Sequence, residues 1–368
     1  MLSCICTRAV SLACLSLLLA IPTWSQQSAV DKMIAQRHYN RALPLVRAAL
    51  ELHPQDVRAL VALSTIQWAF GQLDASTATA ERAVLAADES AAAHAQLLNA
   101  LGAKLASSRT GTFEKMGLTH RFRKEADRTL QLDPRNVYAH EALARFFWYA
   151  PAMVGGSRAK AKQWVDKLVQ LDAARGYGLK AELDATAPDK AKSLSAVQGD
   201  WMQAVVANQK RYEAYAGLGG CILAGGSDKL GEAEDAAKKA LALDPSRIES
   251  YRLLTAVYVR TARWDQLDAT LKNAHDAIPD DLTADFVVAQ TILDRNIGSQ
   301  WKRAEDHLRV YLGQPSEGLE PTLAVAHWKL GIVLEREGRK SAALKELESA
   351  VSLDSSLDEA KNDLKRLQ

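Results

Sequence analysis

The sequence predicts an all-α fold, a right-handed superhelical solenoid of antiparallel helix hairpins. A short Leu-x-Pro motif ends three amphipathic stretches rich in Ala and Leu, at Leu52-His53-Pro54, Leu132-Asp133-Pro134 and Leu243-Asp244-Pro245. Its spacing is regular, because the intervals from 54 to 88, from 245 to 279 and from 321 to 355 are each 34 residues. One hairpin cannot bury its apolar face alone, but stacked hairpins share a continuous core. A 34-residue period therefore predicts a helical repeat.

The first 25 residues differ from the rest and predict a secretory signal peptide. Arg8 is their only charge, residues 9–21 are apolar, and Thr23-Trp24-Ser25 supplies the small residues that a signal peptidase reads. The apolar run is shorter than the roughly 20 residues of a membrane span, which argues against an uncleaved anchor. We expect cleavage after Ser25 and export to the periplasm or the cell exterior. A lipid anchor on Cys14 stays open, although the apolar run continues past that residue.

Composition narrows the classes of partner. Lys plus Arg (46) nearly balance Asp plus Glu (44), which gives a formal charge of +2 without a basic stripe, so we expect no nucleic-acid partner. Once the signal is removed, we expect no transmembrane segment. Of the four cysteines, the mature chain keeps only Cys221. A lone cysteine cannot form an internal disulfide, and Cys221 lies in an apolar run where we expect it to pack as a small hydrophobic side chain.

The clearest repeat begins at Ala324 and carries small residues where two helices would cross. Leu330-Gly331, Ala343 and Ala350 follow at positions seven and eight, twenty and twenty-seven of the repeat. A larger side chain at the crossing would push the helices beyond the usual 8–10 Å. In these positions the chain resembles the tetratricopeptide repeat (TPR) family. The resemblance implies a superhelix whose first helices line a concave groove, and it covers nearly all of the mature chain.

The other repeats are weaker copies in the same register. The unit near 212–245 carries Tyr215, Gly219 and Ala233, whereas residues 174–210 match least, with Pro188 starting a helix and Trp201 near its middle. Together they predict one solenoid over residues 26–368, with about nine hairpins, some degenerate. A helix at 357–368, charged on one face, is expected to cap its end.

Two inserts interrupt the period. Residues 106–115 are polar and contain Gly, and they predict a loop between two helices of one hairpin. Residues 150–157 stop a helix at Pro151 and start the next at Ser157, which is a good N-cap. A Gly-Gly-Ser before a helix could hold a phosphate, but without a Lys-Ser/Thr ending or a preceding strand it is no P-loop, and we interpret it as a turn.

No motif for catalysis, metal or cofactor binding is present in the sequence. It has no His-Glu-x-x-His and no Gly-x-Ser-x-Gly, and we expect a non-enzymatic protein without a cofactor. His94, His140 and His327 all occupy the fourth repeat position, separated by whole repeats. A shared metal would need them on neighbouring hairpins, so we expect them to pack between helices.

The groove positions that the resemblance implies supply the candidate binding residues. In the fourth hairpin they are rich in aromatic and charged side chains, which commonly anchor interfaces. The set expected to contact a partner is Tyr138, Glu141, Arg145, Trp148, Tyr149, Trp68, Arg252 and Trp328. Trp148 has an alternative, since a register error of one residue would place it in the core. One subset of the family holds a peptide carboxylate with Lys and Asn at fixed groove positions. Asn99 matches one of these positions, but Ala92, Ala95 and Ala103 do not match the others, so we do not expect this specificity.

We therefore predict a protein- or peptide-binding scaffold that acts outside the cytoplasm through the concave groove. The alternative is a periplasmic accessory of a solute transporter that encloses a small molecule. Neither the partner nor the oligomeric state follows from the sequence.

Overall fold

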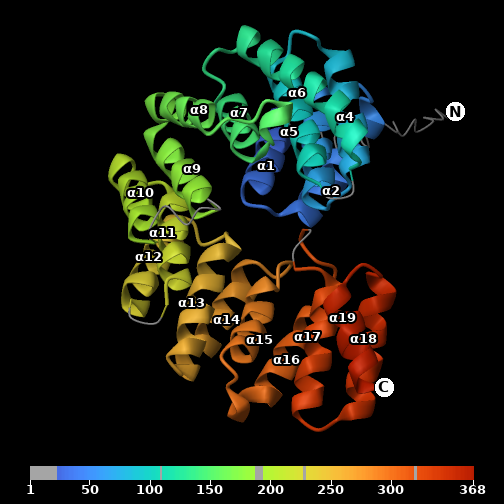
Figure 1. Ribbon diagram of the computed structural model, residues 1–368, viewed down its shortest axis with the longest axis vertical. Coiled ribbons are helices and arrows are strands. Elements are labelled where there is room, and N and C mark those ends of the chain that lie inside the picture. Colours follow the sequence, from blue (N-terminus) through green and yellow to red (C-terminus); the bar gives the residue numbers. More distant parts are fainter. Residues whose placement is uncertain (1–22, 108–109, 187–193, 227–228, 319–320) are drawn as a thin grey trace, which may run out of the picture.

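The computed structural model describes residues 23–107, 110–186, 194–226, 229–318 and 321–368. These residues form helices and their connections, with no strand among them, which confirms the predicted all-α solenoid. Figure 1 shows the helices following one another in a wide curve, with the N-terminal half above and the C-terminal half below. The predicted signal segment up to residue 22 and Pro188 lie outside the described residues. Helix α1 begins at Thr23, before the predicted cleavage point after Ser25.

Eighteen of the α-helices pair in chain order into antiparallel hairpins, and a nineteenth, α19, closes the chain at Asp358–Leu367. The first helices of the pairs are α1 (Thr23–Ala35), α3 (Val57–Ala69), α5 (Ala91–Ala106), α7 (Val137–Tyr149), α9 (Ala173–Ala185), α11 (Tyr212–Ala224), α13 (Ile248–Arg260), α15 (Thr283–Asp294) and α17 (Leu323–Arg336). The second helices are α2 (Tyr39–Leu52), α4 (Leu73–Ala86), α6 (Thr112–Leu132), α8 (Arg158–Leu171), α10 (Leu194–Ala207), α12 (Leu230–Leu243), α14 (Trp264–Ala277), α16 (Trp301–Tyr311) and α18 (Lys340–Leu353). Two short 3₁₀ turns are η1 (Ala152–Val154) and η2 (Gly298–Gln300).

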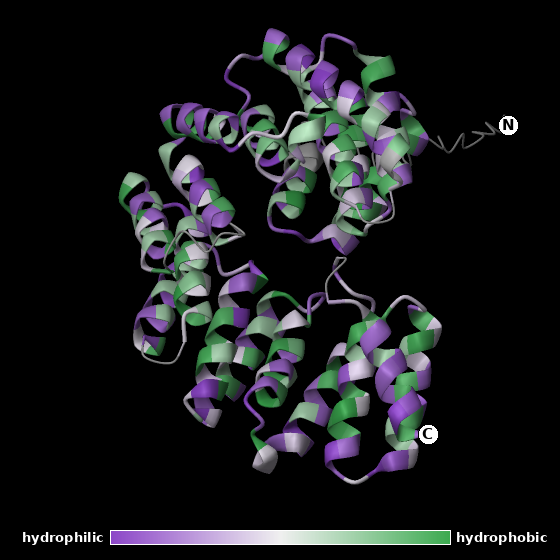
Figure 2. Ribbon diagram, viewed as in Figure 1, coloured by the Kyte–Doolittle hydropathy of each residue, from purple (hydrophilic) through white to green (hydrophobic). Residues whose placement is uncertain are grey.

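The first helices line the inner side of the curve. Consecutive odd-numbered helices contact one another from α1 to α17, whereas within the described residues consecutive even-numbered helices make no contacts of similar extent. Elements on the inside of a curved stack approach more closely than those on the outside. The odd-numbered helices therefore form the concave surface, as the family resemblance implied. Figure 2 shows hydrophobic and hydrophilic residues mixed along each helix, as expected when one face packs and another meets water.

Small residues set the distance between paired helices. A Cβ added at Gly331 would lie 2.9 Å from the Leu347 side chain and 3.3 Å from the Ala343 carbonyl oxygen, which confirms the crossing predicted there. Trp201 of α10 packs in the same way on Gly217 of α11, where an added Cβ would lie 2.3 Å from its ring. Helices thus approach closely at a glycine both in a regular hairpin and at the repeat that matches the family least.

The two inserts are accommodated differently. The loop predicted at 106–115 is shorter than expected, because α6 already begins at Thr112. Most of the extra sequence lengthens α6 to 21 residues instead, since nothing in this polar stretch breaks a helix. The turn predicted at 150–157 is confirmed: Gly155 is left-handed at φ 93°, and the Ser157 side chain accepts a hydrogen bond from the Lys160 amide at the start of α8.

Candidate functional site

Side chains of α7 and α9 form an ion network on the concave surface. Glu141 lies at its centre and accepts hydrogen bonds from Arg145 Nη2 at 2.9 Å and from Arg175 Nε at 2.8 Å. Arg145 also donates to Glu182 Oε2 at 2.6 Å, so two carboxylates alternate with two guanidinium groups. Burial by itself would raise the pKa of Glu141, but the charges of Arg175 and Arg145 outweigh it and hold that pKa below its usual range.

Aromatic rings flank this network at both ends of α7. The Arg175 guanidinium lies 4.4 Å from the centroid of the Tyr138 ring, a cation–π contact. Tyr149 Oη lies 3.0 Å from Thr186 Oγ1, directly after α9. Tyr138 and Tyr149 are still 52% and 55% exposed, which leaves much of each ring open to solvent. Contacts with α9 and with Thr186 thus order two rings that remain exposed to solvent.

Trp148 occupies a different environment from its neighbour Tyr149. It packs against the buried cluster that contains Val165 and Leu168 of α8, and the Arg158 guanidinium covers its ring at 3.7 Å. Its indole Nε1 is buried and has no hydrogen-bond partner among the residues that the structure describes. These contacts favour the packing alternative that the sequence left open for Trp148.

The other predicted binding residues lie several helices away along the solenoid. Trp68 lies in the last turn of α3 and is 46% exposed, and Arg252 lies on α13. Trp328 of α17 donates its Nε1–H to Asp363 of α19 at 2.9 Å and is half-buried, so its ring holds the last helix in place. The structure therefore brings together Tyr138, Glu141, Arg145 and Tyr149 of α7. It packs Trp148 against α8 and leaves the other three predicted residues elsewhere along the solenoid.

Sequence reasoning missed the residues of α9 that complete the network. They are Arg175, Glu182 and Thr186, and they lie in the stretch that matches the repeat least. A usable signal was present, because Arg175 follows Glu141 by 34 residues and Glu182 follows Arg145 by 37. Residues one repeat apart on first helices are neighbours in a solenoid, so opposite charges at that spacing predict an ion pair.

The three histidines at the fourth repeat position pack inside their own hairpins. His94 Nδ1 lies 2.6 Å from Glu125 of α6, His140 packs edge-on against Trp164 of α8, and His327 Nδ1 lies 2.7 Å from Glu346 of α18. In the described residues, no group of three or more His, Cys, Asp or Glu side chains is arranged to hold a metal ion. Cys221 is half-buried, and burial raises the pKa of its thiol.

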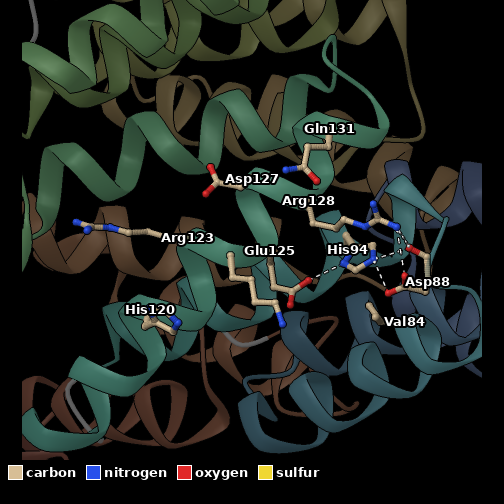
Figure 3. Close-up of a pocket in the computed structure, with 10 residues that line it drawn as sticks. Val84, Asp88, His94, His120, Arg123, Glu125, Asp127, Arg128 and Gln131 are labelled. Atoms are coloured by element: carbon tan, nitrogen blue, oxygen red, sulfur yellow. Dashed lines mark hydrogen bonds and ion pairs between the residues drawn. The ribbon is translucent and has the colours of Figure 1, made fainter.

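A depression of about 810 Å³ lies between α6 and the end of α4, and sequence reasoning did not anticipate it. Figure 3 shows that polar side chains line it, and that His94 is held between Glu125 and Asp88. Arg128 closes one wall through bonds to Asp88 at 3.2 Å and to Glu89 at 2.8 Å. Because these groups pair with one another, they hold α6 against the preceding hairpin.

Comparison with known families agrees with this architecture. Residues 33–101, from the end of α1 into α5, match the family model described as "Tetratricopeptide repeat". Residues 33–101 thus carry tetratricopeptide repeats. Its remaining hairpins continue the same stacking, although the family model does not extend over them. A comparison with curated proteins gives no match.

Several solved structures are similar to this chain at low sequence identity. IFIT1, solved with Gppp-AAAA, is 14% identical with a TM-score of 0.51, over 93% of this chain and 68% of IFIT1. Yeast Tom70 is 14% identical with a TM-score of 0.49, over 94% of this chain and 87% of Tom70. YrrB, described as a TPR protein with an unusual peptide-binding site, is 18% identical with a TM-score of 0.33, over 55% of this chain and 97% of YrrB. At these identities the similarity to IFIT1 shows the fold alone.

Proposed function

We propose that this TPR protein is a scaffold that binds a peptide segment of a partner protein on the concave surface of α7 and α9. The observation that carries the proposal is the pair of half-exposed rings, Tyr138 and Tyr149, held at the two ends of an ordered ion network. Exposed aromatic rings beside arginine are typical of residues that dominate binding energy. Ordering them before binding lowers the entropy cost of association.

The ion network suggests the character of the peptide. Glu182 is half-exposed beside Arg145, so each sign of charge remains accessible on this surface. An extended segment with an apolar side chain for each ring and a charged or polar side chain between them fits this arrangement. Buried charge pairs contribute more to specificity than to affinity, so we assign the network to selecting the segment and the rings to holding it.

We further propose that the protein acts outside the cytoplasm. The support is the sequence of residues 1–25, with its short apolar run and its small residues at 23–25. Within the described residues, no helix is long and apolar enough to cross a membrane. N-terminal sequencing of protein from the culture medium or the periplasm should give Gln26 as the first residue. Protein found only in the cytoplasm with Met1 would overturn this part.

Binding can be tested without knowing the partner. Residues 26–368 would be screened against a displayed library of random peptides, and selected peptides measured by fluorescence anisotropy. Tyr138→Ala and Tyr149→Ala should each weaken binding about 10-fold or more, since an anchor contributes on the order of 2 kcal/mol. The control is Leu85→Ala, an apolar side chain on the second helix α4 that is 86% exposed and lies outside the concave surface.

The variants must keep their helical circular dichroism for the comparison to hold. Peptides that bind both tyrosine variants as tightly as the unchanged protein would overturn the site. A screen that selects no peptide, while an oligonucleotide or a small metabolite raises the melting temperature, would overturn the peptide scaffold itself.

A further inference from the structure

The first hairpin contacts turns that lie more than two hundred residues further along the chain. Gln36 Nε2 donates to the Asp244 carboxylate at 3.2 Å, 208 residues away. Arg37 pairs with Glu249 at 3.1 Å, and Arg41 pairs with Asp280. These partners lie in or next to the α12–α13 and α14–α15 connections, so one edge of the first hairpin bridges several later hairpins.

Glu317, in the connection between α16 and α17, makes the most buried of these contacts. Its Oε1 accepts a hydrogen bond from the Asn40 backbone N–H at 2.7 Å, and its Oε2 accepts one from Asn40 Nδ2 at 2.5 Å. Asn40 Nδ2 also donates to the Ser316 carbonyl oxygen at 3.2 Å. Asn40 is in the first turn of α2, where backbone N–H groups have no partner within the helix and are free to donate to Glu317. Glu317 is only 6% exposed, so this contact excludes water.

These contacts close the curve of the solenoid. Figure 1 shows that the connection after α16 reaches the first hairpin at α2. Helices α9 to α12 form the opposite side of the curve. We propose that the first hairpin is a latch: it closes the superhelix into a ring through Asn40 and Glu317, and deprotonation of Glu317 releases it. Release would widen access to the concave surface. The use of that access by a partner rests on the proposed function, but the latch does not depend on it.

Several charged groups surround Glu317 in the closed ring. Asp280 and Asp281 face it from the α14–α15 connection, and Tyr39 faces it from α2. Burial raises the pKa of Glu317 to about 7, with the charges of Asp280 and Asp281 adding to it, despite the hydrogen bonds from Asn40. Burial also raises the pKa of Asp281, whose nearest charges include Arg252 and Glu249. At Asp281 the charge of Arg252 acts in the opposite direction, but burial outweighs it.

The direction of the pH effect follows from linkage. A carboxyl group whose pKa is higher in the closed ring than in the open chain favours closure when protonated. This contribution is complete below the ordinary pKa of 4.5 and is lost as pH rises to about 7. We therefore expect the ratio of open to closed molecules to rise about 10-fold between pH 6 and pH 8.5.

His38 acts in the opposite direction. It is buried in the α1–α2 turn near Asp280, Arg41 and Asp281, and burial lowers its pKa. A histidine with a lowered pKa favours closure when neutral, so its contribution is lost as pH falls below 6.5. Despite its burial, hydrogen bonds from Ser246 and Gln36 hold the pKa of the Asp244 carboxyl group below its usual range. Above pH 6.5 the change thus comes from Glu317.

Pulsed electron spin resonance can measure the opening directly. Spin labels would be placed at Arg47→Cys on α2 and Lys340→Cys on α18, both exposed, in residues 26–368 carrying Cys221→Ser. We expect a short distance at pH 6 and a second, longer population that grows at pH 8.5. Glu317→Gln keeps the neutral form of the side chain, so it should remove most of the pH response while the ring stays closed.

Asn40→Asp is the matched opposite variant, because it places a second carboxylate against Glu317. It should show the open population already at pH 7. An unchanged distance distribution between pH 6 and pH 8.5, or an identical pH response in Glu317→Gln, would overturn the latch. Neither result depends on a peptide, so failure of the latch and failure of the binding site are measured separately.

Discussion

The hairpins at the ends of the solenoid and those in its middle join their helices differently. In α1–α2, α3–α4, α13–α14 and α17–α18, three residues connect the helices, and the central one has a positive φ. The bond from the Arg339 amide to the Leu334 carbonyl oxygen at 2.9 Å is typical of such a turn. In α5–α6 and α7–α8 the connections are longer, and residues 150–157 include a 3₁₀ turn. The candidate binding surface lies in this less regular middle.

This difference shows where the repeat tolerates change. A three-residue turn fixes the angle between two helices, so sequence variation there must preserve one backbone conformation. A longer connection relaxes that constraint, which fits the proposal that α7 and α9 bind a partner. The four predictions below test this contrast, from the largest expected effect to the smallest.

Trp148→Ala should destabilise the middle of the solenoid by about 3 kcal/mol, because it empties the space beside Val165 and Leu168. Trp68→Ala is the matched change at the end of a regular hairpin, where the ring is 46% exposed, and it should cost about 1 kcal/mol or less. Urea unfolding followed by circular dichroism gives both values. Equal losses would mean that Trp148 is a surface residue and belongs with Tyr149.

Acid should lower the stability of the regular C-terminal half by protonating two carboxylates that pair with arginine. Glu305 pairs with Arg339 and Glu234 pairs with Arg263, and each arginine is the last residue of a three-residue turn. Burial would raise the pKa of Glu305, but bonds from Arg309, Arg339 and Lys302 lower it to about 2. A bond from Arg263, opposed by burial and helped by Lys238, lowers the pKa of Glu234 to about 2.

A lowered carboxyl pKa contributes stability that is present above 4.5 and lost as pH falls to about 2. Each of the two ion pairs should account for up to about 3 kcal/mol of this loss. Unfolding measured at pH 5 and pH 2.5 should show a smaller difference in Glu305→Gln than in the unchanged protein. Glu348→Gln, an exposed control on α18, should leave the difference as it was.

Gly331→Leu should cost about 1–3 kcal/mol by forcing α17 and α18 apart, since an added Cβ already meets Leu347 at 2.9 Å. Gly231→Leu on α12 is the control, because a Cβ there meets nothing within 4 Å. Thermal melts of the two variants should separate clearly. If both melt at the temperature of the unchanged protein, the crossing at Gly331 does not limit the packing.

The three-residue turns give the smallest effects, and the two variants differ in sign. Gly338→Ala places a side chain at φ 76° and should cost about 1 kcal/mol. Ala262→Gly relieves the same strain at φ 53° and should stabilise by less than about 1 kcal/mol, because glycine also loses more entropy on folding. Loss of stability in both variants would indicate that the left-handed residue does not limit these turns.

Much of the candidate site was predictable from its register. Tyr138, Glu141, Arg145 and Tyr149 lie together on the concave surface because first-helix positions repeat with the hairpin. Whether Trp148 joins them was not predictable, because a shift of one residue along a helix turns a side chain from the groove toward the core. Arg175 and Glu182 were missed because their repeat carries few of the residues that mark the register.

The sequence by itself determined the period, the hairpins and the small residues at their crossings, because these depend on neighbours within about 34 residues. The tertiary structure alone decided that Asn40 meets Glu317, 277 residues away. Each hairpin rotates slightly on the one before it, and the longer connections of the middle change that rotation. Closure depends on the sum of all these small rotations, so no local pattern reveals it.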